Sequence, residues 1–106
     1  MIFMGNTRAE LKNKFKQILG NDNVYYQPPE SVKLKYDCII YKNKAPFTKR
    51  ANNHLYILQH MYQVTYITSN PVSTIPDKML EEFPMIERVN DFVSDNLYHY
   101  IYELYF

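Results

Sequence analysis

The last ten residues most narrowly limit what this chain can fold into, because they alternate with a period of two and are largely apolar on both sides. A period of two is that of a β-strand, whose successive side chains point to opposite faces of a sheet. One set of alternating positions is Tyr98, Tyr100, Tyr102, Leu104 and Phe106, and the other is Leu97, His99, Ile101, Glu103 and Tyr105. We therefore expect residues 97–106 to form a covered strand, either inside the sheet or at an edge completed by a neighbouring subunit.

Four earlier segments also have the composition or the alternation of strands, namely residues 23–27, 34–42, 55–68 and 85–92. The run from Cys38 to Tyr41 is continuously apolar, which is typical of a strand inside a sheet. Pro28 and Pro29 should end the first of these strands, because proline lacks the amide hydrogen of a ladder bond. Residues 93–96, Val-Ser-Asp-Asn, predict the turn of a closing hairpin.

Two segments have the spacing of helices. In residues 7–19 the apolar positions recur every three or four residues, opposite a lysine-rich face. Thr7 and Glu10 form a capping box at its start, and Gly20 suits its end. A second, shorter helix should begin near Ser73 and end before Pro84.

The length of 106 residues fits one domain, with residues 1–22 carrying the first helix and residues 23–106 carrying the sheet and the short helix. The order of the elements predicts an α+β fold. We expect a mixed or mainly antiparallel sheet of about four to five strands, with two helices packed on one side.

The charges are strongly polarised along the chain although the net charge is only +1. Up to Asn53 there are ten Lys or Arg and four Asp or Glu, whereas from His54 onward there are two and seven. The two parts therefore carry net charges of +6 and −5. Two complementary patches of this kind suit head-to-tail contact between copies, and scattered solvated charges are the alternative.

Residues 43–54 have no periodicity and contain Pro46, a basic pair and two asparagines, which predicts a long loop. Long loops in compact domains are often functional. We therefore expect a partner-binding surface made of Lys42, Lys44, Phe47, Lys49, Arg50, Asn52 and Asn53.

The residue types that carry chemistry are scattered. Cys38 is the only cysteine and lies within an apolar run, so it predicts core packing and a reducing compartment. The histidines, at positions 54, 60 and 99, lack the spacing of a zinc site, and two glycines cannot make a phosphate-binding loop. We expect no catalytic, metal or cofactor site, no enzyme activity, no export signal and no membrane span.

An ordered set of motifs resembles one family of viral proteins. The set consists of Asn23-Val-Tyr-Tyr-Gln-Pro-Pro-Glu30, Leu34-Lys-Tyr-Asp-Cys-Ile-Ile-Tyr41, Ala51-Asn-Asn53, Tyr62-Gln-Val-Thr-Tyr-Ile67, Ile75-Pro-Asp77 and Asp95-Asn-Leu-Tyr-His99. In this order the motifs are similar to those of the tail terminator proteins of long-tailed bacteriophages, also called tail completion or tail-to-head joining proteins. The resemblance covers residues 23–106, and the chain has Asp37 where that family is expected to have proline.

The resemblance implies a structural virion protein with a mixed sheet flanked by helices and with no cofactor. Such a protein assembles as a homo-oligomeric ring, typically a hexamer, at the head-proximal end of the tail. It stops growth of the tube that the tail tube protein forms, and it joins the tail to the head connector. DNA passes through the ring without sequence recognition. It would lie in the virion and, during assembly, in the host cytoplasm.

Two other classes of function stay open on the residues alone. Lys42, Lys44, Lys49 and Arg50, together with many tyrosines, could bind a nucleic acid, although alternating tyrosines usually pack within sheets. A small regulatory or inhibitor protein is the other alternative, and it predicts a stable monomer or dimer with one tight partner. The state of assembly separates these classes from a ring.

Overall fold

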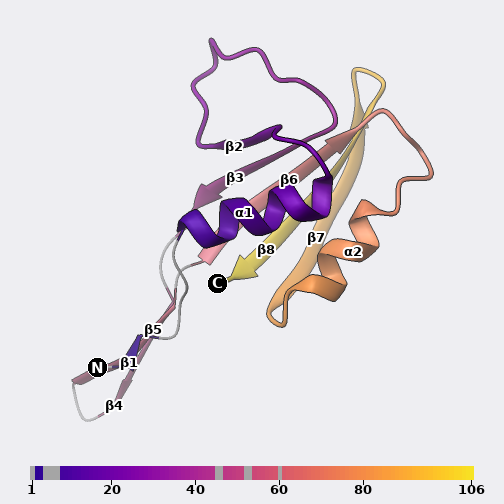
Figure 1. Ribbon diagram of the computed structural model, residues 1–106. Helices are drawn as coiled ribbons and strands as arrows, with labels where there is room; N and C mark the ends of the chain where they lie inside the picture. Colours follow the sequence, from indigo (N-terminus) through magenta and orange to yellow (C-terminus); the bar gives the residue numbers. More distant parts are fainter. Residues whose placement is uncertain (1, 4–7, 45–46, 52–53, 60) are drawn as a thin grey trace.

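The main body is built on a five-stranded mixed sheet, seen in Figure 1. The computed structural model describes residues 2–3, 8–44, 47–51, 54–59 and 61–106. The strand order is β2 (Val24–Tyr26), β3 (Cys38–Asn43), β6 (Met61–Thr68), β8 (Leu97–Tyr105) and β7 (Ile86–Ser94). β2 runs parallel to β3 and the other neighbours are antiparallel. This sheet and its two helices confirm the expected α+β class.

Both helices cover one face of this sheet (Figure 1). They are α1 (Arg8–Leu19) and α2 (Ile75–Glu82). The apolar stripe of α1 points inward because its residues recur at helical spacing, and the alternating residues of the strands face it. The buried core consists of Leu11, Phe15, Ile18, Val24, Ile39, Tyr41, Tyr62, Val64, Tyr66, Met79, Phe83, Tyr102 and Leu104.

Aromatic rings join the helices to the sheet. The ring centroid of Phe15, on α1, lies 5.2 Å from that of Tyr41 on β3 and 5.6 Å from that of Phe83 after α2. The buried tyrosine hydroxyls have partners, since Tyr66 lies 2.8 Å from the hydroxyl of Ser73 and Tyr102 donates to the carbonyl of Pro76 at 3.2 Å. These tyrosines therefore serve the packing role that their alternation predicted.

The final strand lies inside the sheet. β8 pairs with β6 along one side and with β7 along the other. Of the two possibilities open from the sequence, the interior position is therefore confirmed. The alternation is confirmed too, because Tyr102 and Leu104 are buried in the core.

A two-residue turn joins β7 to β8, as the residues there predicted. Asp95 and Asn96 have φ angles of 53° and 62°, and these left-handed values are those of the tight hairpin turn that suits the twist of paired strands. Asp and Asn tolerate this backbone better than most residues do. The hairpin is consequently short and regular at this end.

Three expectations for the middle of the chain are wrong in whole or in part. Residues 55–68 do not form one strand, because β5 (His54–Gln59) and β6 belong to different sheets. Residues 43–54 do not form one loop, because β3 extends to Asn43 and Phe47–Ala51 form a further strand, β4. The predicted strand over residues 34–42 begins only at Cys38.

A second, three-stranded sheet stands away from the main body (Figure 1). Its order is β1 (Ile2–Phe3), β5 and β4, with β1 parallel and β4 antiparallel to β5. We call it the β-arm. Its strands β4 and β5 are inserted in the chain between β3 and β6, whereas β1 precedes α1. The projection of the β-arm gives the molecule extents of 51 × 29 × 23 Å.

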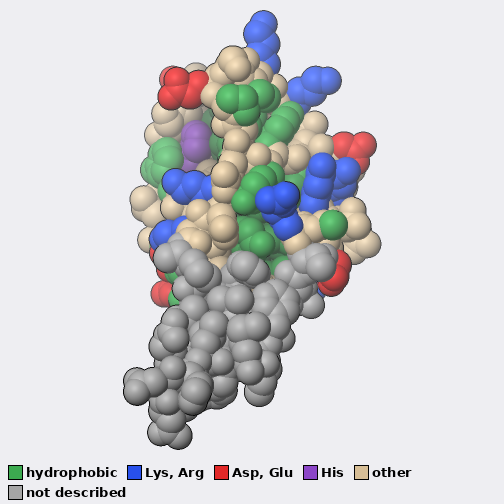
Figure 2. Space-filling model, turned by 90° about the vertical axis from the view of Figure 1, so that its left-hand side faces the viewer, with side chains coloured by type: hydrophobic (Ala, Val, Ile, Leu, Met, Phe, Trp, Pro, Cys, Tyr) green, Lys and Arg blue, Asp and Glu red, His purple; other side chains and the backbone are tan. Residues whose placement is uncertain are grey.

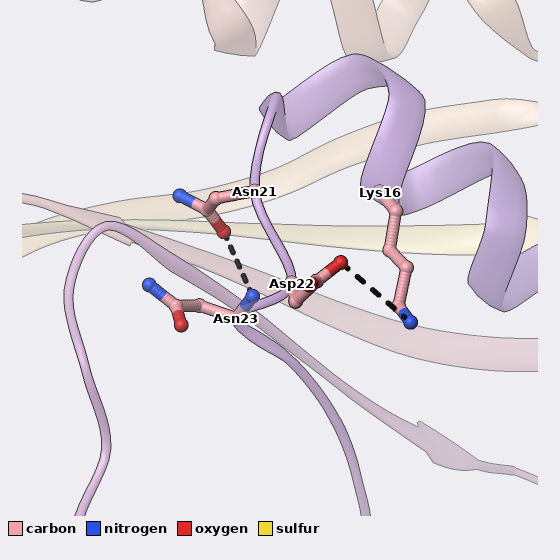
Figure 3. A network of polar contacts seen from close by, with 4 residues as sticks. All are labelled: Lys16, Asn21, Asp22 and Asn23. Carbon is pink, nitrogen blue, oxygen red and sulfur yellow. Dashed lines mark hydrogen bonds and ion pairs between the residues drawn. The ribbon is translucent and has the colours of Figure 1, made fainter.

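A small polar network orders the corner after α1 (Figure 3). Gly20 ends the helix with a φ of 81°, as its position predicted, whereas Thr7 of the predicted capping box lies outside the described residues. The side-chain oxygen of Asn21 then accepts the backbone N–H of Asn23 at 2.8 Å, and Lys16 pairs with Asp22 at 3.8 Å. This corner leads the chain directly into β2.

Candidate functional site

The residues predicted to bind a partner lie at the base of the β-arm and within it. Lys42 is exposed near the end of β3, and Lys44 follows that strand. Phe47, Lys49 and Arg50 belong to β4, so they lie on a strand of the β-arm and not on a loop. Asn52 and Asn53 lie outside the described residues.

Lys44 forms an ion pair within the chain. Its Nζ atom lies 2.8 Å from Oε1 of Glu103 on β8, and both side chains are about one-third exposed. Its backbone N–H donates to the carbonyl of Met61 at 2.8 Å. Lys44 therefore fastens the base of the β-arm to the interior strands β6 and β8. No local pattern in the sequence could have revealed a partner 59 residues away.

A groove of about 600 Å³ opens between β3 and the loop that follows β2. Its lining is mainly apolar, with one acid and one lysine, and consists of Gln27, Pro28, Pro29, Glu30, Val32, Leu34, Ile40, Lys42 and Asn43. Lys42 is thus the member of the predicted set that lies in a hollow. Sequence reasoning missed the other lining residues, because it took Pro28 and Pro29 only as the end of a strand.

Hydrogen bonds hold the loop that walls this groove. The backbone N–H of Asn43 donates to the side chain of Gln27 at 3.0 Å, and that of Lys35 donates to the hydroxyl of Tyr25 at 3.2 Å. At the far end of the loop, the side-chain amide of Asn23 donates to the carbonyl of Asp37 at 3.2 Å. These hydrogen bonds fix the loop against β3 and so maintain the wall of the groove.

Part of the charge split in the sequence is also a split in space, although Lys14 of α1 lines one hollow together with Glu81 and Glu82 of α2. α2 and β7 carry five exposed acids and only two basic residues. The acids are Asp77, Glu81, Glu82, Glu87 and Asp91, and the basic residues are Lys78 and Arg88. Residues 38–53, which include β3 and β4, contain four basic residues and no acid. In Figure 1 the β-arm projects on one side of the body, and β7 with α2 lies on the other.

A band of hydrophobic side chains is exposed on the face seen in Figure 2, with Lys and Arg side chains on both sides of it. A face of this composition suits contact with another protein, because apolar area supplies affinity and the surrounding charges supply orientation.

The groups whose pKa values are shifted from their ordinary values belong to the core. Cys38 is fully buried in β3, and burial, with the Asp37 carboxylate adding to it, raises the pKa of its thiol to about 12. Burial likewise raises the pKa of Tyr102 to about 12 and raises the pKa values of Tyr41, Tyr62 and Tyr66. Such groups stay protonated at neutral pH, which fits packing and not nucleophilic catalysis.

Metal-binding residues do not gather in the part of the chain that the structure describes. No group of three His, Cys, Asp or Glu side chains there is placed to hold an ion. His99 instead uses its Nδ1 atom in a 3.0 Å hydrogen bond with the carbonyl of Leu97, and its ring stacks on Phe92 with centroids 4.6 Å apart.

The described helices include none that is long and apolar enough to cross a membrane. Comparison with known proteins adds no assignment, since no family model, no curated protein and no solved structure matches this chain.

Proposed function

We propose that this protein is a structural component of a long-tailed bacteriophage that assembles as a ring, of six subunits, at the head-proximal end of the tail. The ring ends growth of the tail tube and presents the surface to which the head connector binds. The ordered motifs of residues 23–106 suggest this function. The shape and charge of the subunit support it.

The observation that carries the proposal is the β-arm. The β-arm is a small sheet of strands of two, six and five residues, and a sheet of this size needs its hydrophobic face packed against another element to be stable in water. Its strands also leave backbone N–H and C=O groups at their edges, which favour pairing with another chain. A neighbouring subunit meets both needs.

The separation of charges supports a ring more than a symmetric dimer. The basic β-arm and the acidic surface of α2 and β7 are different surfaces on different sides of the subunit. Contact between two different surfaces is heterologous, and repetition of such a contact closes into a ring when the rotation allows it. A two-fold dimer would instead bring like surfaces together.

Deletion of the coding sequence from the phage or prophage genome that carries it tests the function. We expect lysates to contain filled heads and unjoined tails of irregular length in electron micrographs. Expression of the protein from a plasmid should restore joined particles and infectivity.

Joined particles with tails of normal length in the deletion lysate would refute the proposal. Sedimentation of the purified protein provides a second measurement, in which mixing with tails from the deletion lysate should place several subunits at one end of each tail. A stable monomer that ignores these tails would instead favour the regulatory alternative.

A further inference from the structure

Two edge strands on opposite sides of the subunit are complementary in charge. We infer that β7 of one subunit pairs with β4 of the next, so that each β-arm extends its neighbour's five-stranded sheet. This inference rests on the proposed ring and specifies its subunit contact. The occupant of the β7 edge is thus a second copy of this chain.

β7 is the long free edge of the main sheet. It spans nine residues and pairs with β8 along one side only. Three apolar side chains on it are exposed to solvent, with exposed fractions of 46% for Val89, 44% for Phe92 and 61% for Val93. An exposed apolar edge of this length is a surface on which another strand can add.

The other described edges restrict the choice of partner strand. β2 has three residues and is followed by two prolines, and β1 has two residues. β4, with five residues, is the remaining edge. The pairing of β7 with β8 is interrupted between Arg88 and Asn90 and then continues without a break to Ser94. β7 is longer than β4 and can pair with all five residues of β4, through residues on both sides of this interruption.

The charges on these strands favour pairing of β7 with β4 over pairing of two β7 edges with each other. β4 contains Lys49 and Arg50 and no acid, whereas β7 contains Glu87 and Asp91, both exposed. Arg88 is the one basic residue of β7, and its guanidinium lies 5.8 Å from the centroid of the Tyr100 ring within the subunit. Two β7 edges together would place acids opposite acids, which opposes that contact.

The irregularities at both edges agree with a selective contact. β7 carries the extra residue Val89 between Arg88 and Asn90, and the pairing of β4 with β5 is shifted between Lys49 and Arg50 by an extra residue on β5. Such shifts bend an edge and limit indiscriminate pairing between sheets. An edge of this kind accepts a strand of matching shape and charge, and the β-arm reaches outward from the side away from β7 (Figure 1).

Charge exchange between the two strands tests the inference. One variant carries Glu87→Lys and Asp91→Lys, a second carries Lys49→Glu and Arg50→Glu, and a third carries all four changes. Each double variant should complement the deletion phage at least about tenfold less well than the natural protein, because like charges then meet. The four-fold variant should regain most of the activity, since attraction returns with the signs exchanged.

The matched control is Lys12→Glu with Lys33→Glu, which reverses two exposed cations, one on α1 and one in the loop after β2. It should complement as the natural protein does. The urea midpoints of all variants should agree, which shows that the substitutions leave the fold intact. If the variant with Glu87→Lys and Asp91→Lys has a shifted midpoint, the variant with Glu87→Gln and Asp91→Asn is used in its place.

The outcomes separate this contact from the proposed function. If the double variants complement fully, or the four-fold variant restores nothing while remaining folded, the β4–β7 contact is refuted and the ring stands. If the deletion itself leaves tails joined and of normal length, the proposed function is refuted.

Discussion

Replacement of Phe15 by alanine should remove most of the coupling between α1 and the rest of the core. Phe15 is fully buried, and its ring lies against Tyr41 of β3 and Phe83 beyond α2. Truncation of such a phenylalanine leaves a cavity that neighbouring groups fill only in part, and it typically costs about 3–5 kcal/mol. A domain of this size has a total stability of about 5–15 kcal/mol, so the loss takes a large share.

Urea denaturation followed by circular dichroism measures this loss. With a denaturant slope of about 1.5 kcal/mol per molar, within the usual range for small domains, the midpoint should fall by roughly 2–3 M. Phe92→Ala is the matched control. Phe92 is 44% exposed on β7 and stacks on His99, so its truncation should cost about 1–2 kcal/mol, well below the cost for Phe15.

Equal midpoints for Phe15→Ala and Phe92→Ala would refute the reasoning. They would mean that α1 does not close the core as described. A changed slope with an unchanged midpoint would instead indicate a change in the unfolded or folded state and would equally contradict the predicted loss of core packing.

Four further predictions concern other parts of the molecule. The free energy of unfolding should fall as the pH rises from about 9 toward 12. Cys38 and Tyr102 have folded-state pKa values of about 12, above their ordinary values of 9.0 and 10.0, so the unfolded chain releases these protons at lower pH than the folded chain does. A urea midpoint that stays constant over this range would contradict the burial of both groups. Deletion of residues 102–106 should prevent folding, because it removes two fully buried side chains and part of an interior strand, and a soluble product with a near-normal thermal midpoint would disprove this. Lys44→Ala should lower stability by less than about 1 kcal/mol, since its ion pair is partly exposed, and the loss should shrink in high salt; a loss that is independent of salt would point to packing. In the free chain, amide hydrogen exchange should be faster in β4 and β5 than in β6 and β8, and it should slow in β4 and β5 when the proposed ring assembles. Equally slow exchange in all four strands of the free chain would mean that the β-arm needs no neighbour.

The elements of the main body could be predicted because burial shaped their sequences. The alternation in residues 97–106 reports an interior strand, and the three- and four-residue spacing in α1 reports a helix with one buried face. Gly20, Asp95 and Asn96 occupy positions where the backbone has positive φ, so their residue types carried direct information. In each case a local pattern reflects a local physical constraint.

The β-arm could not be predicted in the same way. A strand in a small projecting sheet is not selected for an apolar face against a core, so Phe47-Thr-Lys-Arg-Ala51 shows no alternation and looked like part of a loop. The break near residue 60 was hidden because β5 and β6 are both rich in strand-forming residues. Which strands share a sheet, and that Lys44 meets Glu103, depend on long-range contacts that no local pattern encodes.

The groove beside β3 shows a further limit of local reasoning. Its wall is a loop whose position depends on hydrogen bonds from Asn43 and Lys35 to residues up to 16 positions away. Prolines at positions 28 and 29 predicted where β2 ends and could not predict where the chain goes next. A surface formed in this way becomes visible only in three dimensions.

The place of β8 between β6 and β7 has a consequence for how the protein is made on the ribosome. β8 is the last of these strands to be synthesised, yet β6 and β7 meet in the sheet only through it. Until its residues have left the exit tunnel, α1 and β6 lack the side chains of Tyr102 and Leu104 that complete their core. Folding of the main body must therefore wait until translation of this segment is finished, and during that interval the aromatic residues of the nascent chain stay exposed.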